Sequence, residues 1–245
     1  MPLYTAPQFP ASFENSAKTL TTITAHATIN TKGTWTSMIA STVSDAYGFW
    51  TVATGMNVTA TATGGLMDIG VGPSDPPEIV VPNWDVGWAG TTGATSPRYP
   101  KMQFWPIFIP AGSKVWARLA AAITVDVCLL KVVLNTNTPF EVNLAIDATA
   151  YGVVVTGSRG TVATSGAAVY GTSVLLGTTS KDHNLWTIGL DGGTDTSRVN
   201  LGDHYAQLMI GSGTTGPIGE WAFNTETTTE SVGGPFPPIP VYQQV

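Results

Sequence analysis

The sequence predicts an all-β protein made of two tandem sandwich-like units. Three observations indicate this fold class. No stretch of a dozen residues repeats apolar side chains at helical spacing between capping signals. Several stretches instead alternate apolar and polar residues with the period of two that a half-buried strand requires. The chain also contains 27 Gly and 17 Pro, and these give a strand-to-turn rhythm of about 8–12 residues that is typical of a sandwich or barrel.

The clearest predicted strand lies within residues 122–134. Its apolar positions Ile123, Val125, Val127 and Leu129 alternate with Thr124, Asp126 and Cys128. A second alternating strand is predicted at residues 142–146, where Val142, Leu144 and Ile146 are the apolar positions. Short apolar runs at residues 151–155, 174–176 and 186–190 are each bounded by Gly, Ser, Asp or Asn, and we expect each of them to form a strand as well.

Proline and glycine punctuate these strands. The sequence Pro110-Ala111-Gly112 predicts a tight turn into a strand at residues 114–119, because Pro presets one turn dihedral and Gly permits a positive φ. The Pro-rich segments 2–10 and 233–240 cannot be central strands, since Pro lacks the N–H that a sheet ladder needs. We expect both segments to be extended arms or loops.

An internal repeat predicts the division into two units. Residues 36–52 align without gaps on residues 172–188, with Trp50 opposite Trp186. Two shorter matches follow in the same order, residues 67–72 with 208–213 and residues 104–107 with 236–239. Chance similarity between Thr/Ser/Gly-rich strands is the alternative.

The predicted units are residues 1–134 and residues 135–245, with the boundary in the polar stretch 135–139. The second unit stops where the last strands of the first would begin. A truncated product, a degenerate unit or strands supplied by another chain would each account for this difference.

The composition favours a component of an assembly. Charged residues make up only 11% of the chain, against roughly 25% in an ordinary soluble domain. A surface rich in hydroxyl groups and poor in charge can pack against neighbouring subunits at little ionic desolvation cost.

The net charge is −6 and no basic run occurs, so nucleic acid is not an expected partner. Arg118, Asp126 and Lys131 interrupt the most apolar window, residues 115–134, so no membrane span is expected. The single cysteine, Cys128, allows no disulfide within the chain.

The search for catalytic or cofactor chemistry singles out no residue. The three histidines, His26, His183 and His204, are not part of a recognisable nucleophile motif. Asp191 and Asp195 in a Gly-rich loop could ligate calcium, but their spacing differs from the twelve-residue calcium loop, and a hairpin turn is the preferred interpretation. We therefore expect no enzymatic activity, no cofactor and no metal.

Aromatic residues are the remaining candidates for a site. Trp84, Trp88, Tyr99 and Trp105, together with Phe104, gather around a Gly/Thr-rich loop at residues 87–95. They predict either an interface and core cluster, which is the favoured interpretation, or an exposed platform on which a glycan stacks.

One region resembles a known group of proteins. The sequence FWPIFIPAGSKVWAR at residues 104–118, with LMDIGVG at residues 66–72 upstream, resembles virion proteins of tailed bacteriophages, and the second unit lacks the Pro-Ala-Gly turn. The resemblance implies jelly-roll-like β-sandwich units and a place in the virion as a capsid decoration or cement protein or another head-associated protein. A neck, tail or receptor-binding component that binds carbohydrate is the alternative, and a β-sandwich hydrolase is a third hypothesis. The expected partners are copies of the chain itself, as a trimer or ring, other virion proteins and, in the receptor-binding case, a host-surface glycan.

Overall fold

The computed structural model describes residues 13–15, 20–54, 63–89, 101–136, 144–161, 171–179, 202–208 and 219–225. All regular elements in these residues are strands: β1 Phe13–Asn15, β2 Thr21–Thr24, β3 Thr36–Ile39, β4 Ala46–Thr54, β5 Thr63–Val71, β6 Glu78–Ala89, β7 Lys101–Ile109, β8 Val115–Ala121, β9 Val127–Asn135, β10 Val153–Val154, β11 Arg159–Gly160, β12 Gly202–Leu208 and β13 Gly219–Thr225. The described part of the chain therefore contains no helix, and the prediction of an all-β protein is confirmed.

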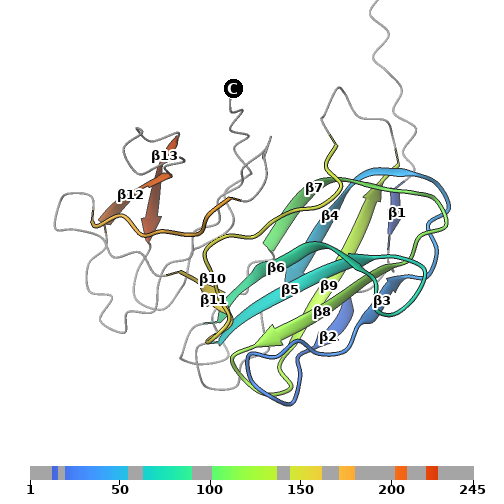
Figure 1. Ribbon diagram of the computed structural model, residues 1–245, viewed down its shortest axis with the longest axis horizontal. Coiled ribbons are helices and arrows are strands. Elements are labelled where there is room, and N and C mark those ends of the chain that lie inside the picture. The colour runs from blue at the N-terminus through green and yellow to red at the C-terminus, as the bar shows by residue number, and fades with distance from the viewer. Residues whose placement is uncertain are drawn as a thin grey trace, which may run out of the picture.

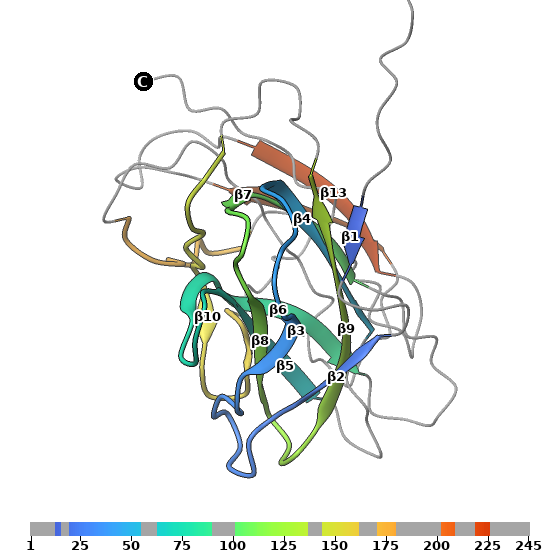
Figure 2. The ribbon, with the colours of Figure 1, turned by 90° about the vertical axis from the view of Figure 1, so that its right-hand side faces the viewer.

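Two antiparallel sheets form the main body and lie as facing layers (Figures 1 and 2). Sheet I has the order β1-β9-β4-β7, and β2 joins the same edge of β9 as β1. Sheet II has the order β3-β8-β5-β6. Together they form a β-sandwich.

The strand pairing is nested. β1 and β2 pair with β9, β3 with β8, β4 with β7, and β5 with β6. A long hairpin rolled into two four-strand layers gives this order, which is the order of a jelly roll. The first half of the chain thus has the jelly-roll-like sandwich that was predicted for it.

The core lies between the two sheets. Sheet I contributes Phe49 and Leu130, and sheet II contributes Met67 and Leu119, all fully buried. Burial of each such side chain contributes about 1.5–3 kcal/mol. The core residues alternate along their strands, so that each strand presents its other face to the outside.

The strand predicted at residues 122–134 needs a correction in both position and face. Residues 122–126 form the turn between β8 and β9, with Val125 at φ 48°. In β9 the buried residues are Cys128, Leu130, Val132 and Leu134, while Leu129 faces outward. Both faces of this strand are apolar, so the alternation did not define the buried face. The charged Lys131 is the residue that marks the outer one.

The predicted Pro-Ala-Gly turn is confirmed. The amide of Ser113 donates to the carbonyl of Pro110 at 3.3 Å, and Gly112 has φ 79°. A side chain at Gly112 would strain this backbone, because φ in this range favours glycine. Pro110 is therefore the first residue of the turn, and the strand that follows begins at Val115.

Residues 144–148 hydrogen-bond to both β7 and β6. The amide of Ala145 donates to Pro106 O at 2.7 Å, and the amide of Phe108 donates to Ala145 O at 3.2 Å. Three residues later, the amide of Ala148 donates to Val80 O at 2.7 Å. Sheet I ends at β7 and sheet II ends at β6, so this segment links the two sheets along one side.

The second predicted unit is described only in part. The strand predicted at residues 142–146 is wrong over residues 144–146: Ala145 makes one isolated bridge, and Leu144 and Ile146 are exposed because the segment contacts the sandwich through its backbone. Val153 and Val154 do form a short strand, but residues 174–176 lie exposed outside any strand. Trp186, residues 236–239 and both Pro-rich segments lie outside the described residues, so the duplication and the boundary between the units stay predictions.

Candidate functional site

The outer face of sheet I is the most unusual surface of the described residues. An antiparallel sheet with one solvated face normally carries polar side chains there. Here the outward residues of the three long strands are mostly apolar: Tyr47, Trp50 and Val52 on β4, Met102, Phe104 and Phe108 on β7, and Leu129, Lys131 and Val133 on β9. We call this surface the aromatic face.

The aromatic face is ordered by strand register. Trp50 lies opposite Phe104 on one side and opposite Val133 on the other. The Trp50 and Phe104 ring centroids are 5.1 Å apart with planes inclined at 47°. The Tyr47 and Phe108 rings form a second pair, at 5.8 Å. Such cross-strand aromatic pairs each contribute about 0.2–1 kcal/mol and hold the rings in fixed positions.

The side chains of the aromatic face remain accessible to solvent. Trp50 is 39% exposed, Met102 53% and Phe108 39%. Contiguous apolar surface of this kind marks an interaction site in a soluble protein more often than it marks chance exposure. Among the side chains that the structure describes on this face, Lys131 is the one that carries a charge.

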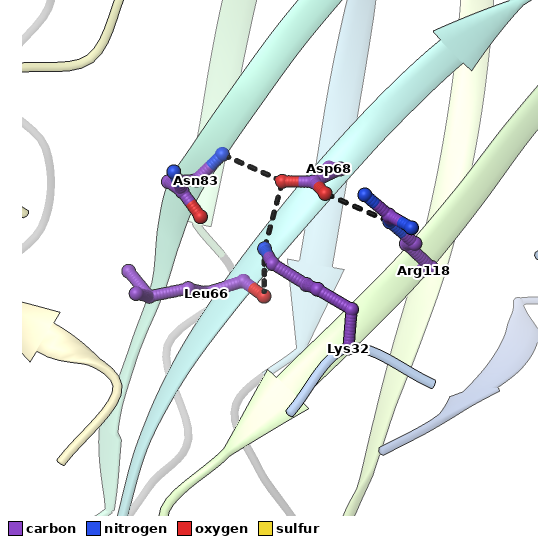
Figure 3. A network of polar contacts seen from close by, with 5 residues as sticks. All are labelled: Lys32, Leu66, Asp68, Asn83 and Arg118. Carbon is purple, nitrogen blue, oxygen red and sulfur yellow. Dashed lines mark hydrogen bonds and ion pairs between the residues drawn. The ribbon is translucent and has the colours of Figure 1, made fainter. Parts of the chain in front are cut away.

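Sheet II presents the opposite character on its outer side, where an ionic cluster surrounds Asp68 (Figure 3). Asp68 lies on β5 and is 3% exposed. Its Oδ1 accepts from Lys32 Nζ at 2.7 Å and from the Asn83 amide at 2.8 Å, and its Oδ2 accepts from Arg118 Nε at 2.8 Å. Lys32 comes from the loop before β3, and Arg118 comes from β8, so the cluster fastens that loop across sheet II.

The two cations of this cluster have further contacts. Lys32 Nζ also donates to Leu66 O at 3.0 Å, and the Arg118 guanidinium lies 4.4 Å over the Trp35 ring. Burial lowers the pKa of Lys32, and the nearby Asp68 carboxylate opposes that effect only in part. A buried carboxylate that accepts from three donors has its hydrogen-bonding capacity satisfied. We therefore interpret the cluster as a structural contact that stabilises the fold.

The predicted aromatic platform is only partly described. Trp84 and Trp105 do come together, with ring centroids 6.1 Å apart in an edge-on arrangement, but they pack inward. Trp84 is 8% exposed, and Trp105 Nε1 donates to Thr51 Oγ1 at 2.9 Å. These two residues therefore pack on the core side of their strands. The backbone of Trp88 in β6 pairs with Gly64 in β5, while the Trp88 side chain and all of Tyr99 lie outside the described residues.

The aromatic face was not recognised in the sequence as a site. In the sequence Trp50 marks the internal repeat and Phe104 belongs to the predicted aromatic cluster, but no pattern there shows that the two rings share one face. The signal was present in Phe49-Trp50 and in Phe104-Trp105, where aromatic residues occupy both faces of one strand. Large apolar residues on both faces of a strand indicate that the outer face is not an ordinary polar, solvated one.

Other candidate groups stay apart in the described residues. His26 is exposed, and its Nδ1 accepts from the Thr28 amide at 2.8 Å. No three His, Cys, Asp or Glu side chains in the described segments lie close enough to hold a metal ion. Asp191, Asp195 and His183 fall outside those segments. Nor do the described segments include a helix that could span a membrane.

The described residues form a β-sandwich with an apolar outer face on sheet I and an ionic cluster on the outer side of sheet II. Comparison of the chain with protein-family models, with curated proteins and with solved structures finds no match. The functional proposal therefore depends on the aromatic face and on the composition of the chain.

Proposed function

We propose that this chain is a non-enzymatic structural protein of a virus particle, located on the capsid as a decoration, cement or other head-associated subunit. The observation that carries the proposal is the aromatic face: an accessible apolar sheet surface with a single charge among its described side chains. Such a surface is costly to leave in water at about 25 cal/mol per Å², and contact with another protein surface removes that cost.

Two further features support an assembly role. Charged residues are only 11% of the chain, so its remaining surface also desolvates at low ionic cost. Jelly rolls are used in viral capsid and lectin domains, which is support by analogy of fold and not by chemistry. The resemblance of residues 104–118 to tailed-phage virion proteins points in the same direction, and those residues include most of β7 and β8.

The test is the protein content of the particle. Particles purified from infected cells and analysed by mass spectrometry should contain the chain in a fixed ratio to the major capsid protein. Density for it on the capsid in a cryo-electron-microscopy reconstruction would place it at the head. Presence in the infected-cell lysate together with absence from purified particles would refute the proposal.

The alternative within the same class is a neck, tail or receptor-binding subunit. The observation that favours receptor binding is the accessible Trp50 and Phe104 ring pair, since such rings stack on sugars. Glycan-array binding by the purified chain that disappears in Trp50→Ala, but persists in Val43→Ala on an exposed loop, would favour that alternative. A chain that binds no glycan supports the capsid position.

A further inference from the structure

The two sides of the aromatic face differ in side-chain size. In the row through Trp50, β7 presents the large Phe104 and β9 presents the smaller Val133. In the next row Val52 lies between Met102 on β7 and Lys131 on β9. The long aliphatic stem of Lys131 can bend aside. In the row through Trp50 the β7 side is therefore bulkier than the β9 side, while the next row carries a long side chain on each side.

Large and small side chains would meet across a twofold axis that lies in the plane of contact, passes Trp50 and runs about 15° from β4, since facing strands are then inclined by about 30°. It places β7 of one copy over β9 of the other, so that Phe104 faces Val133 of the second copy. On each side of the axis this large residue then meets a small one, as in the facing layers of a packed core. Trp50, on the central strand, meets its own counterpart across the axis.

The size of the face suits such a contact. The three long strands of the face are about 30 Å long and about 4.8 Å apart, which gives a projected area of roughly 430 Å². The ridged accessible surface of such a face is larger than its projection, so two copies together would bury about 1,200 Å², the lower end of a stable interface. A second copy offers a face of the same area and the same twist, and two such sheets pack about 10 Å apart with strands inclined by about 30°.

We infer that a second copy of this chain covers the aromatic face, in a twofold sheet-on-sheet contact centred on Trp50. The inference rests on the proposed function, because it names the partner of the surface on which that proposal depends. It also differs from the trimer expected from the sequence, since a three-fold ring uses two different patches while a twofold contact uses the same patch twice. Lys131 lies beside Met102 of the second copy in this arrangement and faces no like charge.

The first experiment is a charge swap at the axis, followed by light scattering and sedimentation at micromolar concentration. We expect a dimer of the unaltered chain. Trp50→Glu and Trp50→Lys should each be monomeric, with dissociation constants raised roughly thirtyfold or more, the scale of a central aromatic hot spot. An equimolar mixture of the two should recover the dimer, because Glu then faces Lys. Leu175→Glu, at an exposed residue outside the sandwich strands, is the matched control and should remain dimeric.

The second experiment keeps Trp50 in place and tests the register. In a Cys128→Ala background, a Phe104→Cys chain mixed with a Val133→Cys chain should be joined by a short bismaleimide linker, and either chain alone much less. Unchanged circular dichroism and melting temperature show that each variant is folded.

Several outcomes would overturn the inference. They are a monomeric unaltered chain, an oligomer that persists in Trp50→Glu, or a linker yield as high for the single chains as for the mixture. If purified particles contain the chain, each of these results overturns the twofold contact and leaves the proposed function intact. If the chain is a dimer in solution but is absent from purified particles, only the proposed function is refuted.

Discussion

Asp68 and Arg118 form an ion pair between adjacent strands, with 2.8 Å between Oδ2 and Nε, on the side of sheet II that faces away from the core. The same carboxylate holds Lys32 at 2.7 Å, so one acidic residue fixes two cations that come from different parts of the chain. The Asp68 carboxylate therefore links the β5–β8 strand pair to the loop before β3, and its loss would weaken both contacts.

Replacement Asp68→Asn keeps the shape of the side chain but removes its charge. Lys32 and Arg118 then lose their counter-ion in a half-buried setting, and we expect a loss of about 3 kcal/mol in the free energy of unfolding. Urea denaturation measures it, with Glu78→Gln at an exposed residue of β6 as the control. A loss below about 1 kcal/mol would show that water already screens the cluster.

Lys32 predicts a dependence of stability on alkaline pH. Burial lowers its pKa in the folded protein below the ordinary value of 10.5, so between these two values the unfolded chain binds more protons than the folded one. The contribution of Lys32 to stability is therefore unfavourable below the lowered pKa and becomes less so as the pH rises toward 10.5. Denaturation at a series of alkaline pH values should show a smaller rise in stability for Lys32→Met than for the unaltered chain. Lys114→Met should keep the rise, and equal slopes in all three proteins would contradict the assignment.

Asn30 anchors residues 157–158 to the sandwich. Its Oδ1 accepts from the Gly157 amide at 2.9 Å and from Ser158 Oγ at 3.0 Å, and its own φ is 58°. Asn30→Gly keeps that backbone conformation and removes both acceptor contacts, so we expect a loss of about 2 kcal/mol and faster proteolytic cleavage within residues 151–161. Asn30→Asp retains an acceptor oxygen and should resemble the unaltered chain. Equal cleavage rates for Asn30→Gly and Asn30→Asp would argue against an anchor.

Gly64 permits the close approach of the same segment. A Cβ at this position would lie 2.5 Å from Ser158 O and 2.9 Å from Gly157 O, both backbone atoms that cannot turn aside. Gly64→Ala should therefore destabilise the protein by about 1–3 kcal/mol, as overpacking does. Gly160→Ala is the control, because its Cβ would meet nothing closer than 4.0 Å. Thermal melting compares the two, and a smaller effect at Gly64 than at Gly160 would contradict the packing argument.

The sequence predicted the features that local chemistry determines. Strand alternation and turn residues were enough for an all-β fold and for the turn at Gly112, because both depend on neighbouring residues. The buried face of β9 could not be predicted in this way, since Cys128 and Leu129 are both apolar and only the opposing sheet decides which one is buried. The pairing of Lys32 with Asp68 joins residues far apart in the chain, so it was visible only in the fold.

The aromatic face lies between these two cases. Trp50 and Phe104 could each be placed on a strand from the sequence, but their pairing depends on the register of β4 with β7. Register is a long-range property, and a slip of one residue would have turned both rings into the core. For the same reason the sequence left two interpretations of Trp84 open, a core or interface residue and a platform residue, because the register of β6 decides which way its side chain points.

The prolines on the two outermost long strands limit how copies of this protein can meet. Pro82 lies in β6 and Pro106 lies in β7, and each interrupts the row of amide hydrogens at the rim of its sheet. A neighbouring chain therefore finds no continuous ladder to extend on this side. Backbone pairing between two chains is therefore blocked at the β6 and β7 rims, whereas contact through the side chains of the aromatic face needs no such pairing.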